Sequence, residues 1–430
     1  MTGRRAERRY ALLVFLFWLP TGLYVATKVL LMHERGLGVA AIGTVVLVFS
    51  LTTAALELPT GGLADVIGRR TVLAASAVAS FAGLALLAVA DSFWLFAASA
   101  VLRGMARALS SGPDQAWFVD TMHAVEGPDA SLTRGLARGE AASSVALGIG
   151  TLAGGALPLA LGAVGPLPAL AVPVAIAAAI ELVRLAVTVF GMPEPPRPRT
   201  SLRAVLRGVP ATIATGLRLG VRDGVLARIL LAGAGVGVAL AAIELLTPGW
   251  LADLVGDPER GASTYAVVAA AGFAASAVGS LLGPWVQRRL GSAVRAGVAG
   301  IALGAVALLG VGLAGPALDG PSSGVPVVAA AYLLLFVGLG VTAAPQAALL
   351  HSRVAPAERA TVVSVESLAL QAAGALGAVT VGALATSRGV PFAFGVAGAA
   401  LVFAAWVVAR IRIADPAPEA ATTEPTPAAV

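Results

Sequence analysis

The chain has 430 residues, of which 58% are hydrophobic and only 12% are charged, and it contains no cysteine. At a mean hydropathy of +0.89, a water-soluble protein would lack the polar residues needed to cover its surface. The absence of cysteine excludes disulfides and thiolate metal sites, and His33, His123 and His351 lie too far apart in sequence to show a metal-ligand spacing. The composition therefore predicts an integral membrane protein with no metal and no other cofactor.

Apolar stretches long enough to cross a bilayer recur along the whole chain. A stretch of roughly 20 residues spans about 30 Å of hydrocarbon. Such stretches lie near residues 10–32, 39–60, 71–90, 93–116, 140–163, 167–190, 225–247, 264–285, 293–314, 325–349, 361–384 and 391–410. The first is too long for a signal peptide and lacks a small-x-small cleavage site. Because a β-barrel would show short alternating segments, we expect an all-α integral membrane fold of about twelve transmembrane helices.

Basic residues predict the orientation of these helices. The expected outer loops hold only Arg35, Arg260 and Arg388. Away from the cytoplasmic ends of the expected spans, the basic residues inside them are Lys28, Arg103, Arg107 and Arg184. All the others, out of 29 in total, lie in or beside the inner loops, so both termini are expected in the cytoplasm. The net charge of +6 does not indicate a nucleic-acid-binding protein, because the arginines are spread over the inner loops rather than gathered in one patch.

A long polar break divides the expected spans into two halves of about six helices each. It begins with PEPPRPR and continues with apolar residues on one helical face and arginines on another, the pattern of a segment that lies at the membrane surface. We expect residues 1–191 and 224–412 to form two pseudo-symmetric halves, and residues 192–223 to form a cytoplasmic linker. Residues 413–430 consist mainly of Ala, Pro, Thr and Glu and predict a disordered tail.

The two halves are weakly alike in sequence. LGIGTLAGGAL at residues 147–157 resembles GALGAVTVGAL at 374–384, and SGPDQAW at 111–117 resembles TAAPQAAL at 342–349. Internal repeats with matching proline-interrupted segments, which contain Pro113 and Pro345, are typical of transporters. The alternative is that any two Ala/Gly-rich membrane helices look alike over so short a stretch.

The decapeptide GGLADVIGRR at residues 61–70 lies between the second and third expected spans. It resembles the loop signature of the major facilitator superfamily, in which a basic residue usually occupies the position of Val66. The matching residues that we expect to act in gating are Gly61, Asp65, Gly68, Arg69 and Arg70.

The resemblance implies two contacts, the first of which locks the halves together while the outside is open. Asp65 would face the positive N-terminal end of the eleventh helix, and Arg69 would contact Asp120 at the inner end of the fourth. The alternative is that these loop charges only enforce the topology.

The fifth expected span contains closely spaced glycines, Gly150, Gly154 and Gly155, which allow two helix backbones to approach each other. They resemble the antiporter signature of the same superfamily, G-P-x-x-G-G, with Thr151 in place of the proline. The resemblance implies antiport by the usual pattern only in part.

Charged residues inside spans are the strongest functional signal, because each costs about 2.5–3.5 kcal/mol on insertion scales and is retained only facing protein or water. Arg103 and Arg107 lie one turn apart on the fourth span, and Glu57 on the second span is the nearest acid if the two helices are neighbours. Their expected role is proton coupling, since many drug-exporting members of the superfamily handle the coupling proton with an arginine in the fourth helix. The alternative is a structural ion pair.

Four further charged residues inside spans, among them Lys28, allow more than one interpretation. Glu181 and Arg184 are three residues apart and can neutralise each other, which makes Glu181 a weaker candidate for proton coupling. Glu244, near the outer end of the seventh span, is either a proton site or an interfacial residue. The candidates for the wall of a substrate cavity are Tyr24, Lys28 and Gln371, although the amine of Lys28 can also extend to the interface.

Together these features predict a secondary active transporter that resembles the drug/proton antiporter branch. It would export a small lipophilic compound across the plasma membrane in exchange for protons, as a monomer in the lipid bilayer. No G-x-x-x-x-G-K-[ST] motif occurs, so ATP is not expected as the direct energy source, and no grouped nucleophile, base and orienting residue indicates an enzyme. The alternatives are uptake of a metabolite, and a membrane sensor or enzyme on the same fold.

Overall fold

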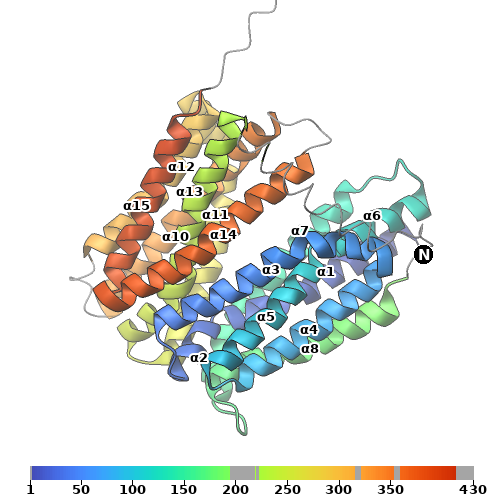
Figure 1. The fold of residues 1–430 in the computed structure, drawn as a ribbon, viewed down its shortest axis with the longest axis horizontal. Coiled ribbons are helices and arrows are strands. Elements are labelled where there is room, and N and C mark those ends of the chain that lie inside the picture. The colour runs from blue at the N-terminus through green and yellow to red at the C-terminus, as the bar shows by residue number, and fades with distance from the viewer. Residues whose placement is uncertain (1, 194–217, 219–221, 315–320, 353–358, 413–430) are drawn as a thin grey trace, which may run out of the picture.

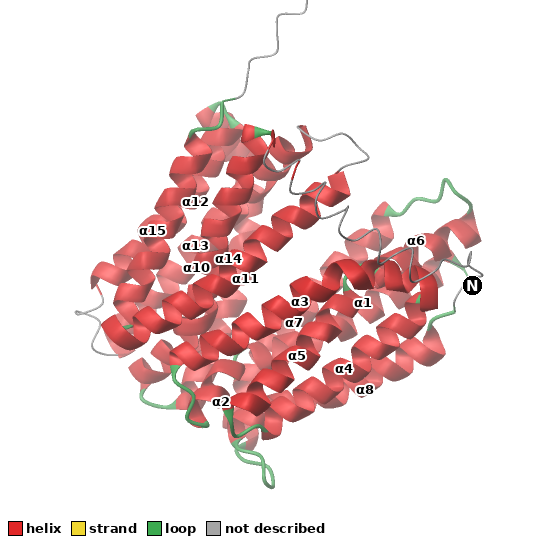
Figure 2. Ribbon diagram, viewed as in Figure 1, coloured by secondary structure: helices red, strands yellow, loops and turns green. Residues whose placement is uncertain are grey.

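The computed structural model describes residues 2–193, 218, 222–314, 321–352 and 359–412. Figure 2 shows that this part of the chain is built from helices, with one isolated β-bridge between Val164 and Leu167. The amphipathic segment predicted for the linker and the disordered tail predicted for residues 413–430 fall outside the described residues.

The first half of the chain forms helices α1 to α8. Their bounds are α1 Gly3–Val25, α2 Lys28–Glu34, α3 Val39–Ile67, α4 Arg69–Val89, α5 Phe93–Ser110, α6 Pro113–Glu126, α7 Thr133–Leu161, the 3₁₀ turn η1 Ala169–Ala171 and α8 Val172–Gly191. Helices α1 and α2 meet at a bend of 40° and form one broken span. Helices α5 and α6 are separated only by Ser111 and Gly112, and the φ of +96° at Gly112 turns the chain between them.

The second half forms helices α10 to α15. Their bounds are α10 Gly224–Val255, α11 Pro258–Leu290, α12 Ala293–Ala314, α13 Pro321–Ser352, α14 Arg359–Arg388 and α15 Val390–Ala409. Asp223 caps α10 by accepting a hydrogen bond of 2.7 Å from the backbone N–H of Val225. Asp257 caps α11 in the same way through Arg260, at 2.7 Å.

The helices account for the expected membrane spans. Ten described helices are long and apolar enough to cross a bilayer, and the bent pair α1 and α2 makes an eleventh span. The remaining expected span corresponds to α5, which has 18 residues and carries Arg103 and Arg107. The prediction of an all-α integral membrane protein is confirmed.

The two halves repeat the same helix neighbours. In the first half α7 packs on α1, α5 on α3 and α4, and α8 on α1 and α4. In the second half α14 packs on α10, α13 on α11 and α12, and α15 on α10 and α12. The helices that looked alike in sequence, α7 with α14 and the α5 region with α13, therefore occupy equivalent places.

The halves meet mainly through two symmetric helix pairs, α3 with α14 and α7 with α11 (Figure 1). The side that holds the start of α1 and the end of α15 is referred to as the terminus side, and the opposite one as the far side. A Cβ built on Gly155, near the far end of α7, would lie 2.8 Å from the carbonyl oxygen of Ala262, near the start of α11. One built on Gly382, near the far end of α14, would lie 2.9 Å from the carbonyl oxygen of Val39 at the start of α3. These close backbone contacts join the halves at the far side.

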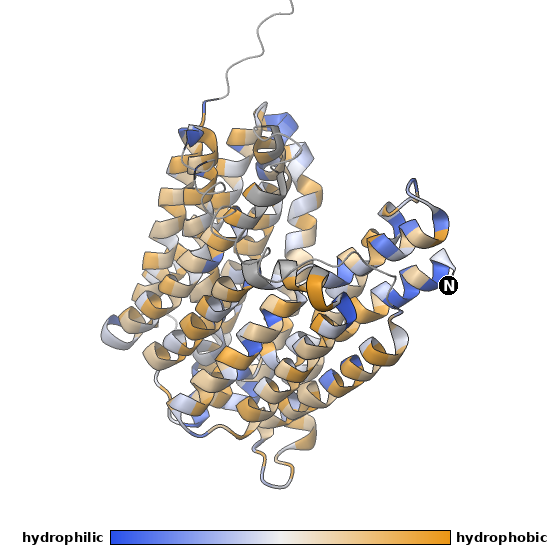
Figure 3. Cartoon of the chain, turned by 45° about the vertical axis from the view of Figure 1, so that its right-hand side comes forward, coloured by the Kyte–Doolittle hydropathy of each residue, from blue (hydrophilic) through white to orange (hydrophobic). Residues whose placement is uncertain are grey.

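Large apolar side chains cover the outer surface of the helices. Phe190, Leu313 and Leu281 are each more than four-fifths exposed, at 89%, 84% and 81%. Figure 3 shows hydrophobic residues along the helices and hydrophilic ones concentrated near helix ends, including the region of the N-terminus. Such a surface is stable in lipid but not in water.

Candidate functional site

The loop between α3 and α4 is a tight turn at Gly68. Its φ of +109° and ψ of +137° lie in a region that only glycine adopts without strain. Helix α4 begins at the next residue, Arg69, whose guanidinium bonds to the carboxylate of Asp120 and to the backbone carbonyl of Ala116 in α6. The contact that the family signature implied between Arg69 and Asp120 is therefore present, inside the first half.

The structure describes the other residues of the signature less completely. Gly61 and Asp65 lie in the last turns of α3, and their side-chain surroundings are outside what the structure describes. Arg70 lies in the first turn of α4 and is exposed. A role in gating for these residues stays a prediction.

Helices α3 and α5 are neighbours, and hydrogen bonds fix their register. The hydroxyl of Thr53 donates to the carbonyl of Gly104 at 3.4 Å, and that of Thr60 donates to the carbonyl of Ala108 at 2.9 Å. Glu57 accepts a hydrogen bond of 3.0 Å from Ser111, just beyond the end of α5. Glu57 is therefore level with the terminus-side end of α5.

Arg103 lies in the middle of α5, between two aromatic rings. Its guanidinium carbon is 5.0 Å from the ring centre of Tyr24 in α1 and 5.5 Å from that of Phe49 in α3. Its Nε and Nη1 atoms are buried and have no hydrogen-bond partner. The absence of Cβ at Gly83 in α4 makes room for this side chain, because a Cβ there would lie 2.7 Å from Cγ of Arg103.

Arg107 faces different aromatic side chains. Its guanidinium carbon is 5.8 Å from the ring centre of Phe17 and 5.6 Å from that of Trp18, both on α1, and the residue is exposed. In this conformation, and among the described residues, no ion pair joins Glu57 to either arginine. Both cations instead contact aromatic rings, and a coupling role for Glu57 stays a prediction.

A buried ion pair lies inside α8. Glu181 and Arg184 are 2% and 3% exposed, and Nε of Arg184 is 2.5 Å from the carboxylate of Glu181. Ser80 donates to the same carboxylate at 2.9 Å, and Arg184 donates to the hydroxyl of Ser76 at 3.3 Å. The expectation that the two charges neutralise each other is confirmed, and α4 supplies the remaining hydrogen bonds.

The ion pair between Lys28 and Glu244 joins the two halves. Nζ of Lys28, the first residue of α2, is 3.6 Å from the carboxylate of Glu244 in α10. The side chain of Lys28 is 17% exposed and that of Glu244 is 58% exposed, so one partner is held by protein while the other is open to its surroundings. The lysine predicted for a cavity wall and the acid predicted as a proton candidate are thus brought together.

The first membrane span is bent between Tyr24 and Lys28. Helix α1 ends at Val25, α2 starts at Lys28, and the two axes differ by 40°. Tyr24 precedes the break and contacts Arg103, whereas Lys28 follows it and contacts Glu244. The first span therefore connects the mid-membrane arginine with the ion pair between the halves.

The second half holds one acid that the sequence reading missed. Glu366 in α14 accepts a hydrogen bond of 2.7 Å from the amide of Gln346 in α13. The sequence feature that could have indicated this residue is a carboxylate within the apolar stretch 361–384. The predicted cavity residue Gln371, one helical turn further on, donates to the hydroxyl of Ser367 at 3.1 Å and contacts no charged residue among the bonds described.

The glycines of α7 serve helix packing. A Cβ on Gly150 would lie 2.8 Å from the carbonyl oxygen of Leu19 in α1, and Gly154 contacts the backbone of Leu23 still more closely. Gly155 faces α11 of the other half. Such distances leave no room for a side chain, so the antiporter-like stretch places three helices in close contact.

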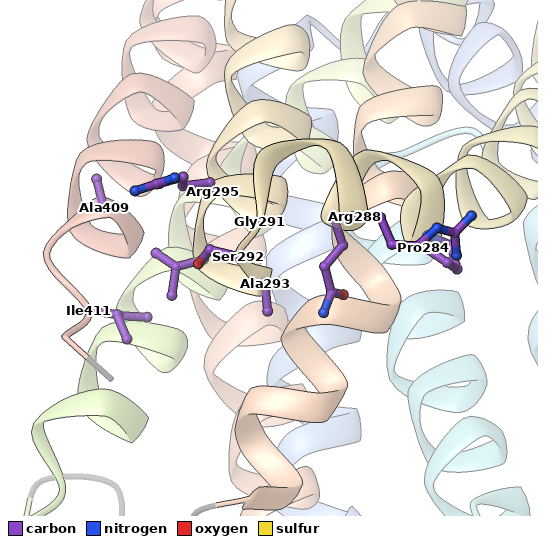
Figure 4. A pocket seen from close by; sticks show the side chains of 10 residues that line it. Pro284, Arg288, Gly291, Ser292, Ala293, Arg295, Ala409 and Ile411 are labelled. Carbon is purple, nitrogen blue, oxygen red and sulfur yellow. The ribbon is translucent and has the colours of Figure 1, made fainter. Parts of the chain in front are cut away.

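A large cavity lies away from these charges, at the terminus side of the second half (Figure 4). It measures about 800 Å³ and is lined by Pro284, Gln287, Arg288, Gly291, Ser292, Ala293, Val294, Arg295, Ala409 and Ile411. The guanidinium of Arg295 already donates one hydrogen bond there, of 3.1 Å, to the backbone carbonyl of Leu290. A second cavity of about 410 Å³ lies on the far side between α2 and α10, beside His33 and Trp250.

No cluster of His, Asp or Glu in the described part of the chain could hold a metal ion.

Comparison of the sequence with family models gives one match, to the Major Facilitator Superfamily, over residues 10–378. Among proteins of curated function, none matches the sequence.

Solved structures share the fold at low sequence identity. The nucleoside transporter NupG superposes with a TM-score of 0.75 at 13% identity, over 94% of this chain and 98% of that one. A bacterial homologue of the human lysosomal transporter Spinster, inward-facing and unoccupied, gives 0.73 at 16%, over 94% and 96%. A bacterial homologue of the iron transporter ferroportin, also inward-facing, gives 0.72 at 17%, over 95% and 98%. With the match over most of its length, the chain belongs to the Major Facilitator Superfamily and is a multi-pass membrane transporter rather than an enzyme.

Proposed function

We propose that this protein exports a small lipophilic compound across the plasma membrane in exchange for protons, with both termini in the cytoplasm. The ion pair between Lys28 and Glu244 is the observation that carries the proposal. Of the ion pairs formed by the described residues, it is the one that joins the two halves. A proton that binds Glu244 removes the attraction to Lys28, so the balance between the joined and the separated arrangement of the halves depends on the protonation of this carboxylate.

The surroundings of Glu244 suit a site that binds and releases protons. Its carboxylate is more than half exposed, so a proton can reach it without crossing the protein. Among the described residues, ionisable groups near it include the phenols of Tyr265 and Tyr332, whose rings lie 6.2 Å apart in a T-shaped contact between α11 and α13. Lys28 is thus the one described cation in contact with the carboxylate.

Export rather than uptake rests on the antiporter-like glycines of α7 and on the resemblance to drug-exporting members. Uptake of a metabolite would use the same ion pair with the opposite coupling sign. The direction is therefore an outcome of the transport experiment and is decided by which pH gradient drives accumulation.

The experiment reconstitutes the purified protein in liposomes with an imposed pH gradient and a panel of lipophilic cations, lipophilic carboxylates, neutral drugs and sugars. We expect one class to move against its gradient, opposite in direction to the protons. Glu244→Gln should abolish gradient-driven transport and retain substrate exchange at equal pH, because glutamine mimics the protonated state. Gradient-driven transport by Glu244→Gln at the normal rate would contradict the proposal, and Glu57→Gln would then be the next variant.

A matched control is Asp253→Asn, which removes an exposed carboxylate from the same helix without a described ion pair. It should transport like the unaltered protein. The orientation is tested separately with Thr200→Cys in this cysteine-free chain, since labelling of residue 200 by an impermeant reagent from outside intact cells would overturn a cytoplasmic linker.

A further inference from the structure

We propose that Arg103 binds an anionic oxygen group of the transported compound, which makes the substrate a lipophilic organic anion, with a carboxylate or phosphate as the binding group. This inference rests on the proposed transport function and names its substrate class. The observation behind it is a guanidinium in the middle of a membrane helix whose Nε and Nη1 are buried without an acceptor.

The other membrane-embedded charges of the first half have partners or exposure that Arg103 lacks. Arg184 is bound to Glu181, and Lys28 is bound to Glu244. Arg107 is exposed, so its charge is not confined to the protein interior. Arg103 alone in this group combines buried donors with the absence of a described acceptor, and a buried cation of that kind is stabilised by an anion that enters from outside.

Among the side chains that the structure describes, no carboxylate on the helices packed against α5 is within reach of Arg103 in this conformation. Helix α4 contains no acid, and Glu57 on α3 is held by Ser111. Ser111 is about two helical turns from Arg103, a rise of roughly 12 Å along α5. Glu181 on α8 is already paired, and Asp114 lies in α6, beyond Ser111. The missing acceptor is therefore better supplied by a ligand than by the surrounding helices.

The two aromatic rings explain how the site persists without a ligand. Tyr24 and Phe49 each present a ring face to the guanidinium within 6 Å, an attraction weaker than an ion pair but sufficient to hold the side chain in place. Both rings are partly exposed and can pack against the apolar body of a ligand. A planar guanidinium with several N–H donors matches the two oxygens of a carboxylate or phosphate.

The site is also placed to influence the ion pair between the halves. Tyr24 precedes the bend in the first span, and Lys28 lies on the other side of the bend, about one helical turn after Tyr24. A ligand that contacts Arg103 and Tyr24 therefore lies next to the bend through which α2 carries Lys28 to Glu244. This is the arrangement expected if substrate and proton are exchanged through one moving segment.

The test measures equilibrium binding to the purified protein in detergent, at constant pH and without a gradient. The probes share one apolar body and differ in charge: 4-butylbenzoate, 4-butylphenyl phosphate, methyl 4-butylbenzoate and a 4-butylphenyl trimethylammonium ion. Binding is followed by thermal stabilisation and by tryptophan fluorescence. We expect at least one anion to bind about tenfold more tightly than the neutral ester and the cation, as a charge-assisted contact predicts. The comparison of carboxylate with phosphate identifies the preferred anion.

Variants assign the preference to one side chain. Arg103→Gln should bind anion and ester with equal affinity, and Arg103→Lys should keep part of the preference because the charge remains. Arg295→Gln, which removes an exposed arginine of the cavity in the second half, should match the unaltered protein. The proposal is wrong if the ester or the cation binds as tightly as both anions, if none of the four probes binds, or if Arg103→Gln keeps the anion preference.

The two proposals fail separately. Loss of the anion preference leaves the effect of Glu244→Gln on gradient-driven transport untouched, because that measurement does not depend on Arg103. Normal transport by Glu244→Gln leaves the binding measurement untouched, because binding is measured without a gradient.

Discussion

The two halves share one arrangement of helices but differ in the charges that they place inside the membrane. The charged residues in the spans of the first half include Lys28, Glu57, Arg103, Arg107, Glu181 and Arg184, whereas those of the second half include Arg228, Glu244, Arg295 and Glu366. The first half thus places cations such as Arg103 and Arg184 in the middle of its helices, whereas Arg228 and Arg295 of the second half lie within the first two turns of theirs. This difference indicates that the repeated helix arrangement provides packing and movement, whereas the charged groups that could act in transport differ between the two halves.

The first half stabilises its cations in three ways. Arg184 has an acid on its own helix, Arg103 and Arg107 have aromatic rings on neighbouring helices, and Lys28 has an acid on the other half. The first arrangement holds in every conformation of the transporter, because both partners belong to α8. The last depends on how the halves meet, which makes it the one that can change during transport.

The largest expected effect is at the buried pair of the first half. Arg184→Ala leaves Glu181 buried without its cation, and we expect the free energy of unfolding in detergent to fall by about 3–5 kcal/mol. Replacement of both residues by methionine should restore most of this stability, since no unpaired charge remains. The matched change in the second half, Glu366→Gln, alters one hydrogen bond and should cost about 1 kcal/mol. Equal losses at Arg184 and Glu366 would show that the halves do not differ in this way.

The next effect tests the packing that the halves share. A Cβ at Gly150 would meet the backbone of α1, and one at Gly237 in α10 would lie 3.1 Å from the backbone nitrogen of Gly374 in α14. Alanine at either position should therefore destabilise the protein by about 1–3 kcal/mol. Gly148→Ala and Gly233→Ala are the controls, because a Cβ at these positions meets nothing within 4 Å, and thermal unfolding should show little loss. A large loss in one half only would refute equivalent packing.

A comparable effect separates the two loops that join equivalent helices. Gly68 has φ +109° and ψ +137°, while Gly291, between α11 and α12, has φ +68° and ψ +9°. Asparagine tolerates the second conformation but not the first. Gly68→Asn should lower stability by about 1–3 kcal/mol and slow transport, whereas Gly291→Asn should cost less than about 1 kcal/mol. Indistinguishable unfolding curves for the two variants would contradict a strained turn at Gly68.

The sequence predicts most of the fold because the features that determine it are local. Apolar stretches of membrane-spanning length are contiguous in the chain, and the pairing of Glu181 with Arg184 follows from a spacing of three residues on one helix. The loop signature likewise predicted the contact of Arg69 with Asp120 from the family resemblance.

The rest of the site depends on how distant helices pack. The pairing of Lys28 with Glu244 and the rings around Arg103 join residues on different helices, and no periodicity in one helix reveals them. The expected partner of the arginines, Glu57, is on the correct neighbouring helix, but the register between α3 and α5 places it beside Ser111. A shift of two turns along a helix is invisible in the sequence and decides which charges meet.

The smallest expected effect on stability concerns the contact between the unlike halves. Because Glu244 is more than half exposed, solvent screens its attraction to Lys28, and the pair should contribute about 0.2–1 kcal/mol. A double-mutant cycle with Lys28→Ala and Glu244→Ala isolates this interaction energy by thermal unfolding. The energy should shrink in about 1 M salt, where charges are screened within about 3 Å. The exchanged pair, Lys28→Glu with Glu244→Lys, should restore the interaction without restoring normal proton coupling, because the acid then lies on α2. Strictly additive effects of the single variants would mean that the two charges do not interact, and that the closed far side is held by the backbone contacts of α3 with α14 and α7 with α11.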